Sequence, residues 1–77
     1  MAKQQLEPVY RQFGAKVESI RTALGWSQDD LAQRVGLART SITNLEAGNQ
    51  RVLLHEVESI AKAFNVTPRH LTRGIWC

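Results

Sequence analysis

Apolar residues recur along this chain at the spacing of helical faces. Phe13, Val17, Ile20 and Leu24 stand at i, i+4, i+7 and i+11, which predicts a helix over about 8–24 that ends before Gly25. A second strong face predicts a helix from about residue 54 to residue 65, and its apolar positions are Leu54, Val57, Ile60, Ala61 and Phe64. Two long amphipathic helices therefore frame a shorter, more polar middle.

The polar middle divides at Gly36. Ser27 is a favourable N-cap and Gly36 a favourable stop, so a helix is predicted over 28–35. The following segment, 39–47, has only Ile42 and Leu45 as large apolar residues, and their i, i+3 spacing predicts a narrow buried stripe. Two short helices around a tight turn are typical of a helix-turn-helix, which places its second helix in the DNA major groove.

The remaining segments complete a predicted all-α fold. Thr67 followed by Pro68 predicts an N-cap and a fifth short helix to about residue 72. No alternating strand pattern or repeat interrupts the chain. We therefore expect a compact five-helix bundle, with residues 8–77 as a single domain and residues 1–7 as a flexible N-terminal arm.

Composition narrows the function classes. The chain has 77 residues, a net charge of +3 and one cysteine, Cys77, whose role the sequence leaves open. Segment 25–48 carries a net charge of −1 between flanks of +2 each, so attraction to phosphates would come mainly from the flanks. No metal-ligand cluster, long apolar span or catalytic constellation is recognisable, so we expect a cytoplasmic, non-enzymatic protein without metal or cofactor.

The whole pattern resembles the phage-repressor and Cro type of helix-turn-helix, the xenobiotic-response-element family. The resemblance covers about 13–71 and rests on residues at fixed spacings: Ser27-Gln28, Leu31-Ala32, Val35-Gly36-Leu37, Ser41-Ile42, Leu45-Glu46, Gly48 and Ile60 to Val66. It implies a sequence-specific DNA-binding regulator of transcription, a repressor, whose partner is double-stranded DNA. The alternative from spacing alone is a short solvated helix at 39–47.

The resemblance also implies roles for individual residues. Arg39, Thr40 and Asn44 match base-contacting positions, with Thr43 as a further candidate. Arg21 and Glu46 match a partly buried ion pair that would fix the recognition helix. The candidate phosphate contacts are Gln28, Ser41, Asn49, Gln50 and Arg51.

Two departures from the family pattern affect these expectations. Ala38 stands where a Ser or Thr often caps the recognition helix, so that helix start needs another partner. Leu53 and Leu54 stand where a proline or polar cap is common, and with Ile75 and Trp76 they could form an apolar patch. We expect this patch to form a homodimer that binds a pseudo-palindromic operator; alternatively, Trp76 folds back over the bundle.

Other regulatory settings remain open on the sequence. The chain could be an antitoxin or the controller of a restriction-modification system, with DNA binding coupled to a protein partner. Because only a few residues follow the fifth predicted helix, we expect no small-molecule effector.

Overall fold

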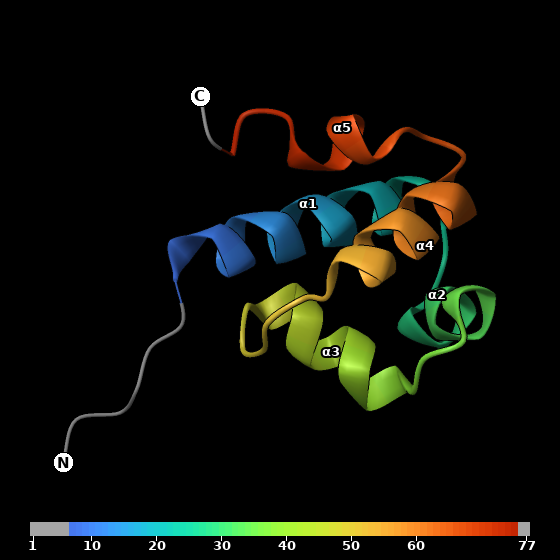
Figure 1. Ribbon diagram of the computed structural model, residues 1–77. Coiled ribbons are helices and arrows are strands. Elements are labelled where there is room, and N and C mark those ends of the chain that lie inside the picture. Colours follow the sequence, from blue (N-terminus) through green and yellow to red (C-terminus); the bar gives the residue numbers. More distant parts are fainter. Residues whose placement is uncertain (1–6, 76–77) are drawn as a thin grey trace, which may run out of the picture.

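Residues 7–75, which the computed structural model describes, form five helices and no strand. Figure 1 shows α1 running through the middle of the bundle, with α5 on one side of it and α3 on the other. The all-helical prediction is confirmed. The helices are α1 (Pro8–Ala23), α2 (Gln28–Val35), α3 (Arg39–Ala47), α4 (Leu54–Phe64) and α5 (Pro68–Thr72).

The helices begin and end where local chemistry dictates. Ser27 accepts a hydrogen bond from the Asp30 N–H at 3.0 Å, and the Asp30 carboxylate accepts one from the Ser27 N–H at 2.9 Å. This reciprocal cap lowers the pKa of Asp30 below its ordinary value. Gly36 ends α2 in the left-handed region at φ 74°. Helix α1 ends at Ala23, one residue before the predicted end, with Leu24 as its C-cap.

The apolar faces meet in one core. Every helix contributes to it, and α3 does so only through Ile42 and Leu45, which are fully buried. Trp26, in the link between α1 and α2, is half-buried against Phe64, with ring centroids 5.6 Å apart, and the Arg34 guanidinium lies 4.1 Å from its ring centre. The buried core residues are Phe13, Val17, Leu31, Ala32, Ile42, Leu45, Ile60, Ala61, Phe64 and Leu71.

Two glycines let α1 approach α3 closely. A Cβ on Gly14 would lie 2.2 Å from the Leu45 carbonyl oxygen, so only glycine fits at this point of α1. Gly48, with φ 76°, ends α3, and a Cβ there would lie 2.7 Å from the Arg11 Cα. The backbone of the third helix therefore sits directly on the first, although Gly14 carried no recognisable signal in the sequence.

Candidate nucleic-acid interface

Helix α3 has two chemically different faces. Ile42 and Leu45 point into the core. The polar side chains of α3 face outward, except for Glu46, which is buried, and Ser41, which is half-buried. The four candidate base contacts share one property, exposure to solvent, and they are Arg39, Thr40, Thr43 and Asn44. A helix of nine residues thus presents a polar row on a rigid support.

A buried ion pair joins α3 to α1. The Arg21 Nε donates to Glu46 Oε2 at 2.6 Å and Nη2 donates to Oε1 at 3.1 Å, while Nη1 donates to the Trp26 carbonyl at 2.7 Å. The hydrogen bond to Glu46 raises the pKa of Arg21, against the effect of burial. The ion pair expected from the sequence is present, and it holds the C-terminal turn of α3 against the end of α1.

Gln28, at the first position of α2, lies between this ion pair and the outer face of α3. Its Nε2 donates to Glu46 Oε1 at 3.0 Å, and its Oε1 accepts a hydrogen bond from the Thr43 hydroxyl at 2.7 Å. Both ends of the carboxamide thus bind within the protein. The Nε2 of Gln28 carries two hydrogens, and only one of them binds Glu46. The predicted phosphate contact of Gln28 can therefore use only the second hydrogen. No pattern in the sequence indicated these inward contacts.

The start of α3 has no side-chain cap. Ala38 has the extended backbone of an N-cap residue, with φ −75° and ψ 152°, but no side-chain oxygen to accept from the first turn. Its carbonyl accepts from the N–H groups of Ser41 and Ile42, as in the helix itself. The N–H groups of Arg39 and Thr40, at the first two positions of the helix, therefore have no side-chain cap and are left to water or a bound group.

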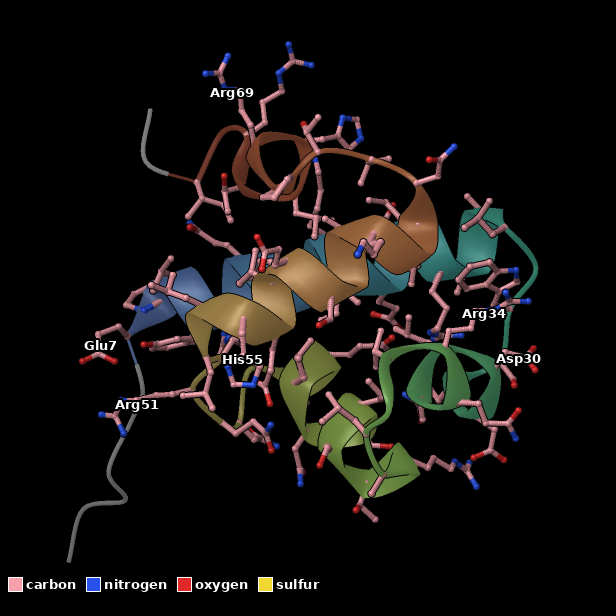
Figure 2. All side chains as sticks on the ribbon, turned by 45° about the vertical axis from the view of Figure 1, so that its right-hand side comes forward. Glu7, Asp30, Arg34, Arg51, His55 and Arg69 are labelled. Carbon is pink, nitrogen blue, oxygen red and sulfur yellow. The ribbon has the colours of Figure 1, made fainter. Side chains whose placement is uncertain are left out.

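The loop after α3 carries the other candidate phosphate contacts. Asn49 and Arg51 are exposed and Gln50 is half-buried, and the Asn49 N–H donates to the Asn44 carbonyl at 2.9 Å. Figure 2 shows Arg51 beside Glu7 at the start of α1, and its Nε lies 3.9 Å from Glu7 Oε1. This exposed acid next to Arg51 was not anticipated from the sequence; an exposed pair of this kind is weak and salt-screened.

The candidate dimer surface is only partly exposed. Leu54 is 89% exposed and Leu53 is 57% exposed, so the expected exposed leucines are present. Ile75 was expected in an exposed patch, but it is half-buried against the core. Together with Leu54 and Val57 it lines an apolar groove of about 190 Å³. Trp76 and Cys77 lie outside the described residues. In place of a polar cap residue, the Glu56 carboxylate accepts from the Leu53 N–H at 3.0 Å.

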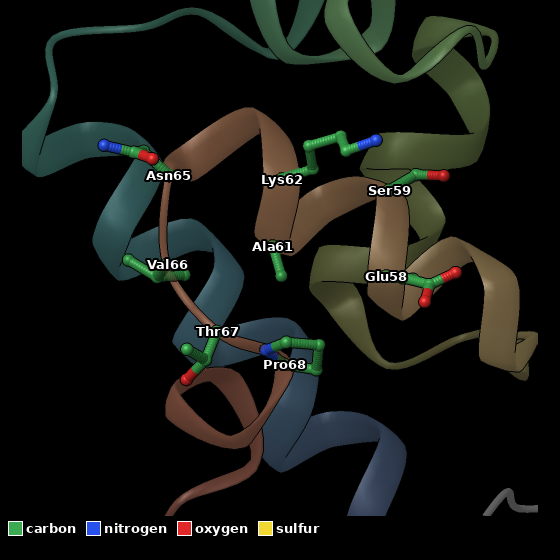
Figure 3. A pocket seen from close by; sticks show the side chains of 8 residues that line it. All are labelled: Glu58, Ser59, Ala61, Lys62, Asn65, Val66, Thr67 and Pro68. Carbon is green, nitrogen blue, oxygen red and sulfur yellow. The ribbon is translucent and has the colours of Figure 1, made fainter.

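A wider hollow of about 560 Å³ lies at the junction of α4 and α5 (Figure 3). Its charged groups are Glu58 and Lys62, one turn apart on α4, and its other lining residues are apolar or small polar ones. Between residues 7 and 75 no three His, Cys, Asp or Glu side chains cluster as metal ligands. No helix in that part of the chain is long and apolar enough to cross a membrane.

A tight turn at Gly36, an inward apolar stripe and an outward polar row on α3 define a helix-turn-helix of the DNA-binding type. The helix-turn-helix family matches residues 17–71. The chain belongs to this family, the phage-repressor and Cro type that the sequence resembles.

One relative is named a control protein, and one neighbour of known structure is named a restriction-modification controller protein. The chain is 42% identical to the control protein C.BamHI from Bacillus amyloliquefaciens over 60 residues, which cover 77% of this chain and 74% of that protein. The crystal structure of the restriction-modification controller protein C.AhdI from Aeromonas hydrophila superposes with a TM-score of 0.81. The two sequences are 34% identical, and the match covers 84% of this chain and 98% of that one.

A third likeness concerns the fold alone. The restriction-modification controller protein C.Esp1396I, solved as a tetramer in complex with its natural 35 base-pair operator, is 22% identical. Its TM-score is 0.81, and the match covers 92% of this chain and 93% of that one.

Proposed function

We propose that this protein is a sequence-specific DNA-binding regulator of transcription that acts as a repressor by placing α3 in the major groove of an operator. Family membership supports DNA binding. The observation that carries the proposal is the outward row on α3, where four neighbouring polar side chains are exposed while both large apolar ones are buried. Such a regulator would act in the cytoplasm, and occupation of a promoter would exclude RNA polymerase.

The chemistry of α3 assigns roles within the row. A guanidinium matches the O6 and N7 acceptors of guanine, which suits Arg39, and a carboxamide matches adenine N6 and N7, which suits Asn44. Thr40 can contact a thymine methyl group with its own methyl. The second Nε2 hydrogen of Gln28 and the side chains of Ser41, Asn49, Gln50 and Arg51 would contact phosphates.

Phosphate neutralisation would give much of the affinity and make it fall with salt. Since α2 and α3 are not strongly basic, the loop after α3 should contribute most to this phosphate-dependent affinity. Arg51 must exchange its weak contact with Glu7 for a phosphate oxygen, a substitution of one anion for another at small cost.

A homodimer would double this interface. A twofold axis that places two copies of α3 about 34 Å apart lets both read one side of B-DNA. Leu53 and Leu54 supply exposed apolar surface beside the groove lined by Val57 and Ile75, and apolar patches of this kind mark protein interfaces. No cofactor or small-molecule effector is required.

Selection from a library of random duplexes with the purified protein tests the proposal. We expect enrichment of a pseudo-palindrome whose two half-sites lie about one helical turn, roughly 10 base pairs, apart. Enrichment of a single unpaired half-site would contradict the dimer, and the absence of any enriched sequence would contradict sequence-specific regulation.

The likeness to C.AhdI, named a restriction-modification controller protein, favours a particular setting, control of a restriction-modification system. In that setting, or if the protein is an antitoxin, DNA binding would be coupled to a protein partner through the leucine surface. Two results together would count against such a partner. The first is that the purified protein binds the operator without any other protein, and the second is that the Leu54→Ser variant binds equally well as a monomer.

A further inference from the structure

The direction of each hydrogen bond can be followed outward from the buried ion pair. A guanidinium has only donors, so both carboxylate oxygens of Glu46 accept from Arg21, at 2.6 and 3.1 Å. The Glu46 side chain is only 4% exposed and an ionised carboxylate has no proton to donate. Any further group that binds Glu46 must therefore present a donor to it.

Gln28 is that further group, and its orientation follows. Its carboxamide has a donor end and an acceptor end, and Nε2 must be the end that faces Glu46 Oε1, at 3.0 Å. The carbonyl oxygen Oε1 is then turned toward Thr43, 2.7 Å from its hydroxyl. The amide cannot be reversed without placing two acceptors against each other.

Thr43 consequently donates inward. A hydroxyl has one proton, and Gln28 Oε1 can only accept. The other oxygen near the Thr43 hydroxyl is the Arg39 carbonyl at 3.1 Å, which is likewise an acceptor within the protein. Whichever of the two takes the proton, the exposed side of Thr43 offers only oxygen lone pairs and a methyl group.

We infer that Thr43 determines specificity as a hydrogen-bond acceptor, selecting a base edge with an amino group, adenine N6 or cytosine N4, over one with a keto oxygen. The inference rests on the proposed function, in which α3 lies in the major groove. In that groove the amino groups donate, whereas guanine O6 and thymine O4 accept. A Thr43 oxygen without an available proton attracts the former and is repelled by the latter.

The test removes the amino group and the hydroxyl separately. In duplexes carrying the sequence selected by the wild-type protein, each adenine of a half-site is replaced by purine and each cytosine by 2-pyrimidinone, which lack the amino group. Thr43→Val keeps the methyl and the shape but has no hydroxyl. Weakened base pairing affects both proteins alike, so the ratio of their affinity losses isolates the contact.

At one position per half-site, amino removal should weaken wild-type binding about tenfold more than Thr43→Val binding. Thr22→Val is the matched control: Thr22 is exposed on α1, and its hydroxyl donates only to the backbone oxygens of Glu18 and Ser19. It should respond as the wild type does. In Gln28→Ala the Thr43 hydroxyl can still donate to the Arg39 carbonyl, so the amino preference at that same position should persist.

Equal losses for wild type and Thr43→Val at every position overturn the inference. A wild-type preference for guanine or thymine at the position where Thr43→Val changes the profile overturns it as well. These outcomes presuppose a selected sequence. If the wild-type protein selects none, the proposed function fails first, and the inference fails with it.

Discussion

The two helices of the helix-turn-helix are stabilised in different ways. Helix α2 begins with a reciprocal cap between Ser27 and Asp30 and ends at a left-handed glycine, all within ten residues of sequence. Helix α3 has no side-chain cap and no acidic residue in its first turn. It is held instead by Glu46, which binds Arg21 on α1, and by the close approach of its backbone to Gly14.

The difference shows what a DNA-reading helix needs. A local cap at the start of α3 would occupy the N–H groups that can meet a phosphate, and apolar residues on its outer face would displace the base contacts. Attachment at its C-terminal turn leaves both free. Helix α2 is thus specified by neighbours in the sequence, whereas the side chains that hold α3 lie 15 or more positions away.

Glu46→Ala should have the largest effect. It leaves the Arg21 guanidinium buried without its carboxylate, at a cost of about 3–5 kcal/mol in the free energy of unfolding. Urea titration measures the loss, with Glu58→Ala, exposed on α4, as a control that should shift by less than about 0.5 kcal/mol. An unchanged midpoint for Glu46→Ala would show that α3 does not depend on the pair.

Gly14→Ala comes next. The added methyl would meet the backbone oxygens of Leu45 and Glu46, at 2.2 and 2.7 Å, so α1 and α3 must separate. We expect a loss of about 1–3 kcal/mol from overpacking, even though alanine favours a helix over glycine by about 1 kcal/mol. Ser19→Ala, exposed on the same helix, is the comparison. A more stable Gly14→Ala protein would rule out the close approach.

Ser27→Ala should cost about 1 kcal/mol, because it removes a cap that affects α2 alone. The other half of the cap depends on pH. Since folding lowers the pKa of Asp30, its contribution is complete above its ordinary value of 3.8 and is lost as pH falls through the lower folded value. Acid titration of stability should show this loss in the wild type, and Asp30→Asn should not show it.

Ala38→Ser should have the smallest effect and the opposite sign. The extended backbone of Ala38 already suits an N-cap, so a serine hydroxyl can accept from the first turn of α3 and add about 0.5–1 kcal/mol. Thermal denaturation without DNA measures the gain. A lower midpoint would mean that the start of α3 is already satisfied by the protein.

The sequence predicted all five helices because their signals are local: the Ser27 cap, the glycine at 36 and the Thr67-Pro68 start. It also predicted the Arg21–Glu46 pair, through the family resemblance. The inward use of Gln28, the role of Gly14 and the position of Glu7 beside Arg51 were not foreseen. Each depends on how distant helices meet, and no local pattern encodes that geometry.

The most direct test of α3 as the reading helix is the base profile of Arg39→Ala. Affinities of this variant and of the wild type are compared, at equal salt, for the selected operator and for its single base-pair substitutions. We predict that the variant loses a preference of about 1–3 kcal/mol at one position per half-site and keeps the others. An equal loss of affinity for every sequence would make Arg39 a phosphate contact and contradict base reading by this face of α3.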